Sequence, residues 1–156
     1  MTRIALFGFL AFLITSCGDR ALESSRIYPA GNIWTYSDTL DLSFDISDTT
    51  DIYDLSLTVE HSEDYPWENL YVRVHNVFPD NDTLSRPVSL ELADRRGQWQ
   101  GDCSGSMCEA VIDLQRSVYF PQTGRYQIWV EQFMRQDSIP GIKSVKISLN
   151  KAERPD

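Results

Sequence analysis

Residues 40–60, with the sequence LDLSFDISDTTDIYDLSLTVE, decide the fold that we expect for this chain. Apolar and polar residues alternate over residues 40–46 and again over residues 53–60, and the polar turn SDTT separates the two runs. Because successive side chains of a β-strand point to opposite faces, each run has one apolar face and one polar face. The stretch therefore predicts two β-strands that each place one face in a core.

The same period of two residues continues through the rest of the chain. Further apolar alternations are separated by turn-forming segments rich in Pro, Gly, Asp and Asn. They begin at Leu70, Val88, Ala110, Tyr126 and Val145. No window of helical length carries an apolar stripe with a helical period. We therefore predict an all-β fold, an antiparallel β-sandwich with jelly-roll topology as one arrangement, over residues 27–150 and followed by a tail at residues 151–156.

Residues 1–16 have the pattern of a secretory signal peptide, in which Arg3 precedes a short apolar run. The sequence LITSC at residues 13–17 resembles a bacterial lipobox, whose cysteine becomes the mature amino terminus and carries acyl chains such as palmitate. We therefore predict that Cys17 anchors an exported protein to a membrane. The alternative is an ordinary signal peptide followed by a chance cysteine. Residues 17–26 are polar and are expected to form a tether with a maximum reach of roughly 30 Å.

The chain is acidic, with 14 Lys and Arg residues against 23 Asp and Glu residues and a net charge of −9. This charge repels phosphate backbones, and no basic cluster offsets it, so we expect no binding to nucleic acid. A hydrophobic content of 42% in 156 residues is enough to form one folded core.

Cys103 and Cys108 lie close together in the sequence GDCSGSMC. In an oxidising compartment this pair favours a local disulfide, which would contribute about 2–3 kcal/mol by closing a short loop. Free thiols are the second alternative. A metal site is the third, and it would need further ligands from a chain that contains only two histidines, His61 and His75.

The sequence HSEDYPW at residues 61–67 contains the residues that come nearest to acid–base chemistry. His61 precedes Glu63 and Asp64, but the three lie in a polar turn where carboxylates usually face water. The chain also lacks the Gly-x-Ser-x-Gly motif of a nucleophile turn. We therefore expect a protein that is not an enzyme, with no catalytic residue, no bound metal and no cofactor.

Aromatic residues are the stronger candidates for a binding surface. The glycines of GQWQG predict a tight hairpin that places Trp99 over the edge of the core, and Trp67 follows the proline of a packed corner. In the strand RYQIWVEQFMR, Trp129 and Phe133 share the face opposite the apolar one, so they need cover from a loop of the domain or from a partner protein. We favour loop cover for Trp129 and retain the partner surface as the alternative. The residues assigned to partner binding are Trp129, Phe133, Arg135, Trp67 and Trp99.

Three segments give the chain a family resemblance. They are DYPWENLY at residues 64–71, LAD followed by GQWQG within residues 92–101, and GRYQIWVEQFMR at residues 124–135. Together with the lipobox they resemble the gliding motility lipoproteins of GldH type from the Bacteroidota. The resemblance implies an envelope lipoprotein without catalytic residues, attached to the outer membrane, that supports a gliding machinery linked to type IX secretion.

The function expected from this resemblance is a non-catalytic scaffold or accessory role with protein partners in the cell envelope. The alternative is a carbohydrate- or peptide-binding envelope lipoprotein, in which Trp67, Trp99 and Trp129 would stack on sugar rings.

Overall fold

The computed structural model describes residues 21–152. The signal segment and Cys17 lie outside these residues, so their assignments stay predictions. The described residues form eleven strands and one 3-10 turn, η1 (Ala30–Asn32). Within residues 21–152, no helix has both the length and the apolar character needed to cross a bilayer.

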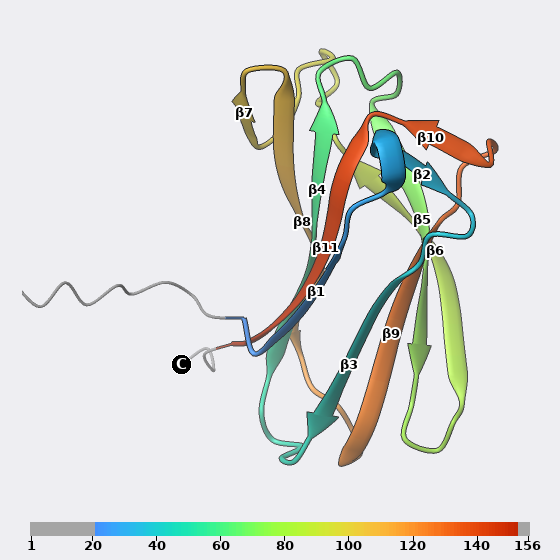
Figure 1. Ribbon diagram of the computed structural model, residues 1–156. Helices are drawn as coiled ribbons and strands as arrows, with labels where there is room; N and C mark the ends of the chain where they lie inside the picture. Colours follow the sequence, from blue (N-terminus) through green and yellow to red (C-terminus); the bar gives the residue numbers. More distant parts are fainter. Residues whose placement is uncertain (1–20, 153–156) are drawn as a thin grey trace, which may run out of the picture.

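The strands form two main sheets that face each other (Figure 1). The first sheet has the order β1 (Glu23–Ile27), β11 (Ile142–Lys151), β4 (Tyr53–Ser62), β8 (Met107–Val118) and β7 (Asp102–Ser104). The second sheet has the order β3 (Leu40–Ile46), β9 (Gly124–Gln132), β5 (Asn69–Val77) and β6 (Thr83–Glu91). A small third sheet joins β2 (Ile33–Thr35) to β10 (Ser138–Pro140).

The eight strands other than β2, β7 and β10 pair in a nested order. β1 pairs with β11, β3 with β9, β4 with β8, and β5 with β6, and every pair is antiparallel. The chain therefore runs as one long hairpin that is wrapped around a core, with its first strand beside its last. This arrangement is the jelly roll, so the predicted antiparallel sandwich is confirmed.

The folded domain begins earlier than the sequence suggested. The expected tether, residues 17–26, overlaps β1, in which Glu23 is paired with Leu149 of β11. The strand has no apolar period because it lies at the edge of its sheet, where backbone hydrogen bonds to β11 hold it in place. Five residues, 18–22, then separate Cys17 from the sheet, and the maximum reach of the predicted tether falls to roughly 20 Å.

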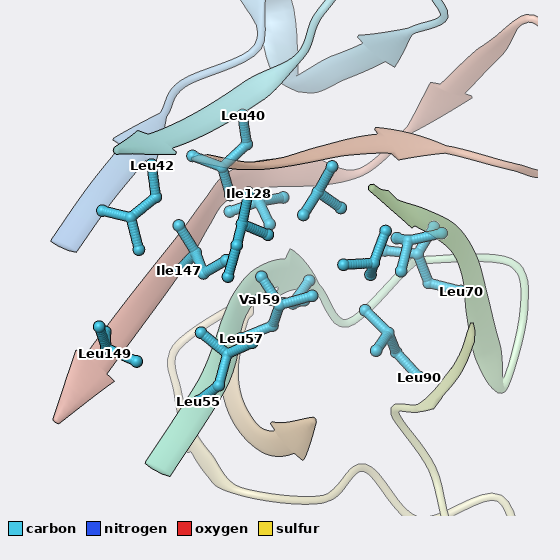
Figure 2. Packing of buried hydrophobic residues seen from close by; sticks show 14 of the residues in the cluster. Leu40, Leu42, Leu55, Leu57, Val59, Leu70, Leu90, Ile128, Ile147 and Leu149 are labelled. Carbon is cyan, nitrogen blue, oxygen red and sulfur yellow. The ribbon is translucent and has the colours of Figure 1, made fainter. Parts of the chain in front are cut away.

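The core lies between the two sheets, where the alternating apolar residues of the sequence meet (Figure 2). Leu40 and Ile128 come from one sheet, and Leu57, Val59 and Ile147 come from the other. None of these five side chains is more than 3% exposed. Each buried aliphatic side chain stabilises the fold by about 1.5–3 kcal/mol, so this layer is the main source of stability.

The two ends of the sandwich carry different segments. β1 starts and β11 ends on the same side of the molecule, which we call the terminal end (Figure 1). The turns of the terminal end are residues 47–52, 78–82 and 119–123. The opposite end, which we call the distal end, carries residues 63–68, 92–101 and 133–137.

Candidate functional site

The solvent side of the second sheet is called the β9 face below. It carries most of the aromatic residues that we assigned to partner binding from the sequence. Along β9, Ile128 and Val130 are buried, while Trp129 and Glu131 point to the other side. The register places His75 of β5 directly beside Trp129.

Trp129 and His75 stack on each other across the two strands. Their ring centroids are 3.4 Å apart and their planes differ by 1°. The imidazole is held at both nitrogens, with Nδ1 2.7 Å from the Ser85 hydroxyl and Nε2 3.2 Å from the Glu131 carboxylate. Trp129 is therefore half-buried, and the ring that stacks on it belongs to a neighbouring strand and not to a loop.

Arg73 extends this row of contacts toward the distal end. Its guanidinium carbon lies 3.8 Å from the ring centroid of Phe133, and one of its nitrogens lies 3.5 Å from the Glu131 carboxylate. The Phe133 ring nevertheless remains 40% exposed. A cation–π contact at such a site contributes about 0.5–1 kcal/mol, enough to orient the ring without covering it.

The distal part of the β9 face contains a groove of about 750 Å³. It is lined by Trp67, Asn69, Tyr71, Pro87, Phe133, Met134, Arg135 and Gln136. Three aromatic rings and the Met134 thioether make the lining mainly apolar, and Arg135 and Gln136 add polar groups. The groove thus brings together two distant segments of the chain. They contain three residues that we assigned to partner binding, namely Trp67, Phe133 and Arg135.

Hydrogen bonds hold the segment that forms one side of this groove. The backbone N–H of Tyr71 donates to the Met134 sulfur at 3.2 Å, and the Tyr36 hydroxyl donates to the Met134 carbonyl at 2.7 Å. The buried side chain of Gln132 accepts from the Met134 N–H and donates to the Gln136 carbonyl, both at 2.9 Å. These hydrogen bonds hold the groove in shape without a bound ligand.

The solvent side of the first sheet has a different character. Glu60 accepts hydrogen bonds from Lys143 at 2.6 Å and from Ser144 at 3.0 Å, with Arg26 3.9 Å away. The hydrogen bond from Lys143 is the main reason that the pKa of Glu60 lies below its usual value. Glu60 is therefore already paired with Lys143 and Arg26 on this side of the sheet.

Trp99 lies apart from the groove, in an aromatic corner at the distal end. Its indole meets the His61 ring edge-on, with centroids 4.6 Å apart, and lies 6.4 Å from the Tyr65 ring. The Tyr65 ring in turn lies 5.4 Å from the Trp67 ring, and its hydroxyl donates to the Asn69 carbonyl at 3.2 Å, so the corner adjoins the groove through both residues. Of the five residues that we assigned to partner binding, Trp67, Phe133 and Arg135 line the groove, whereas Trp99 and Trp129 do not.

His61 and the two nearby carboxylates lie in different surroundings. His61 is fully buried, and burial lowers its pKa below the usual value. Glu63 and Asp64 are exposed at the surface. Across residues 21–152, no group of three or more His, Cys, Asp or Glu side chains is arranged to hold a metal ion.

Cys103 and Cys108 form a disulfide between paired positions of β7 and β8. Cys108 is 1% exposed, whereas Cys103 lies on the edge strand and is exposed. The bridge therefore joins one buried cysteine to one exposed cysteine.

A family model described as GldH lipoprotein matches residues 23–149. This chain belongs to the GldH lipoprotein family. The matched segment begins with the first residue of β1 and ends within β11, so it covers almost the entire jelly roll of this GldH-family protein.

Two relatives carry the family name. The gliding motility lipoprotein GldH homolog of Christiangramia forsetii is 24% identical over 144 residues, which cover 92% of this chain and 88% of the relative. The gliding motility lipoprotein GldH of Flavobacterium johnsoniae is 23% identical over 137 residues, which cover 87% of this chain and 84% of the relative. The predicted family membership is confirmed.

Solved structures with a related shape include carbohydrate-binding modules. CBM35 from Cellvibrio japonicus Abf62 has a TM-score of 0.35 and 14% identity, covering 78% of this chain and 75% of the module. TmCBM61, solved in complex with β-1,4-galactotriose, has a TM-score of 0.29 and 13% identity, covering 84% of this chain and 83% of the module. At these scores the likeness of the GldH-family chain is confined to a general β-rich shape.

Several residues of the β9 face were not singled out from the sequence. Tyr71, Arg73 and His75 lie on the polar side of their strand, where isolated polar residues are ordinary. Met134 follows the end of β9. Their shared location depends on the pairing of β5 with β9, and no local pattern in the sequence reports that register.

Proposed function

We propose that this GldH-family protein is a lipid-anchored, non-catalytic accessory protein of a gliding machinery linked to type IX secretion. In this proposal Cys17 carries the lipid, the outer membrane holds it, and a partner protein docks on the β9 face. The names of the relatives support the link to gliding. The groove on the β9 face is the observation that carries the docking role.

The groove has the composition of an interface centre. The side chains of Tyr71 and Phe133 are 45% and 40% exposed, although both are large and apolar. Interface centres are enriched in aromatic residues, Met and Arg, and a few such residues supply most of the binding free energy. Because hydrogen bonds already fix the segment around Met134, binding there costs little conformational entropy.

The charges around the groove favour a partner that carries an acidic group. Arg135 is exposed and has no ion pair with any residue of the described chain, whereas Arg73 is already paired with Glu131. We infer that the occupant is an extended segment of an envelope protein that inserts an apolar side chain beside Phe133. A carboxylate of the same segment binds Arg135, because an exposed guanidinium is well shaped for such a contact.

The proposed docking is tested by co-purification from cross-linked membranes. Phe133→Ala and Arg135→Glu are each expected to lower partner recovery by about tenfold or more, since loss of one interface anchor costs roughly 2 kcal/mol. The matched control is Tyr119→Ala, which removes a ring that is 70% exposed at the terminal end. Equal recovery with all three variants, at unchanged melting temperature, contradicts docking in the groove.

A glycan is the alternative occupant, and the same variants distinguish it. Titration of tryptophan fluorescence with a panel of envelope glycans is expected to show no saturable change. A saturable response that Trp67→Ala or Phe133→Ala abolishes would replace the protein partner with a carbohydrate ligand.

The anchor is tested separately. Cys17→Ala is expected to release the protein from the membrane fraction or to leave it as an uncleaved precursor, because several acyl chains are needed for stable attachment. Membrane fractionation together with the intact mass of the protein measures both results. Normal processing and unchanged fractionation of the variant would contradict the lipid anchor.

A further inference from the structure

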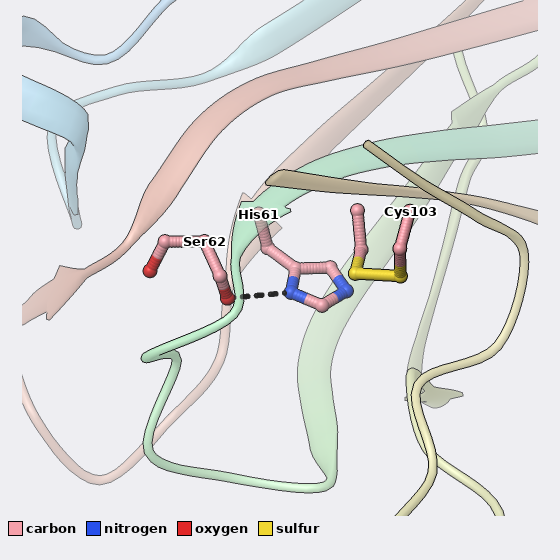
Figure 3. The surroundings of a disulfide bond; sticks show 4 residues. His61, Ser62 and Cys103 are labelled. Atoms are coloured by element: carbon pink, nitrogen blue, oxygen red, sulfur yellow. Dashed lines mark hydrogen bonds between the residues drawn. A yellow bond between two sulfur atoms is a disulfide. The ribbon is translucent and has the colours of Figure 1, made fainter. Parts of the chain in front are cut away.

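A buried histidine lies directly beside the disulfide. His61 of β4 is the cross-strand partner of Cys108 on β8, and Cys108 is the cross-strand partner of Cys103 on β7. Paired residues on adjacent strands share a face of the sheet, so the three side chains form one row. Figure 3 shows the imidazole next to the sulfur–sulfur bond.

The hydrogen bonds of His61 determine which nitrogen is protonated. Its Nδ1 lies 3.0 Å from the backbone carbonyl oxygen of Ser62. A carbonyl oxygen only accepts, so we assign the proton to Nδ1, and the burial that lowers the pKa keeps the ring neutral. Nε2 is then an acceptor, and it is buried without a hydrogen-bond donor among the described residues.

Aromatic rings and the disulfide surround the His61 imidazole. The rings of Trp99 and Tyr65 contact the imidazole at centroid distances of 4.6 Å and 5.7 Å. These rings and the strand pairing shield the nitrogen from water. An unpaired buried acceptor is uncommon in native proteins and calls for an explanation.

We propose that the Cys103–Cys108 bridge is a thiol–disulfide exchange site, with an external dithiol as its reductant and His61 as the positioning residue that receives the buried thiol. The oxidised site keeps the His61 acceptor unpaired, whereas the reduced site supplies the S–H donor of Cys108. The proposal is independent of docking in the groove, because none of the three residues lines it.

The exchange begins at Cys103, the exposed cysteine of the bridge. A thiolate of the external dithiol attacks Sγ of Cys103, the Sγ–Sγ bond breaks, and the electron pair moves to Sγ of Cys108. The second thiolate of the dithiol then attacks the mixed disulfide and releases Cys103. The dithiol leaves as a disulfide, and the two protons that it loses end on the two cysteines. The thiol of Cys108 donates its hydrogen bond to Nε2 of His61.

The decisive measurement is the redox equilibrium of the bridge in the full-length lipoprotein in detergent. The protein is equilibrated with graded mixtures of reduced and oxidised dithiothreitol, and freed thiols are counted by alkylation and mass spectrometry. His61→Leu is expected to favour the disulfide by about tenfold or more, which corresponds to about 30 mV or more. His61→Gln, which retains a side-chain acceptor, is expected to restore part of this difference. Equal equilibrium constants for His61 and His61→Leu in folded proteins would overturn the proposal.

A second measurement does not depend on substitution of His61. Single variants leave one cysteine free, and each is exposed to oxidised glutathione. With Cys108→Ser, the accessible Cys103 is expected to form the mixed disulfide at least tenfold faster than Cys108 does in the Cys103→Ser protein. Equal rates, or faster reaction at Cys108, would overturn the proposed direction of attack.

Discussion

Trp34→Ala is expected to cost about 3–5 kcal/mol in the free energy of unfolding and to lower the melting temperature by roughly 10 °C or more. Trp34 is fully buried in β2, opposite Ile139 of β10, and its indole N–H donates to the Asp38 carbonyl at 2.7 Å. The substitution leaves a large cavity and removes this hydrogen bond. Thermal and urea unfolding of the purified domain measure the effect.

Ile33→Ala is the matched control for this prediction. Ile33 is the neighbour of Trp34 in the same strand, but its side chain is 42% exposed. Its replacement is expected to change stability by only about 0.5 kcal/mol. Similar losses for the two variants would show that Trp34 does not anchor β2 to the core.

Gly101→Ala is expected to destabilise the protein by about 2–5 kcal/mol. Gly101 has a φ of +85°, and a Cβ there would lie 2.1 Å from the Glu109 carbonyl oxygen and 3.0 Å from the Ala110 Cα atom. A positive φ costs an alanine about 1–2 kcal/mol, and the clash with the backbone of β8 adds about 1–3 kcal/mol. Urea unfolding gives the total loss.

Gly105→Ala separates the two contributions. Gly105 has a φ of +63°, but a Cβ there would meet no atom within 4 Å. This control is expected to lower the free energy of unfolding only by the cost of a positive φ for alanine, about 1–2 kcal/mol. If both glycine variants lose the same free energy of unfolding, the close approach of Gly101 to β8 does not affect stability.

The sequence predicted the strands of the core and not the order in which they pair. The alternation in residues 40–46 and 53–60 predicted β3 and β4 correctly, because a period of two residues is a local property of a half-buried strand. β1 was missed because it is a short, mostly polar edge strand that lacks this period. The jelly-roll order depends on contacts between the two ends of the chain, which leave no local pattern.

The candidate site was predictable only in its residue types. Exposed aromatic residues with arginine indicated a binding surface, and the groove does contain Trp67, Phe133 and Arg135. Their proximity follows from the antiparallel register of β5 and β9, which pairs residues 50 to 60 positions apart in the sequence. The stack of His75 on Trp129 was missed for the same reason, since a histidine on the polar side of a strand gives no signal of its partner.

The nested pairing of the strands has a consequence for how the protein is made. β1 is synthesised first, but β11, which pairs with both β1 and β4, is synthesised last. Until the ten residues of β11 have emerged, β1 has no neighbour in its sheet and one edge of β4 stays open. Folding that waits for such long-range pairing is slow, and open strand edges favour aggregation. A chain cut short before Ile142 would therefore keep the predicted signal segment at residues 1–16, yet lack the strand that closes the domain.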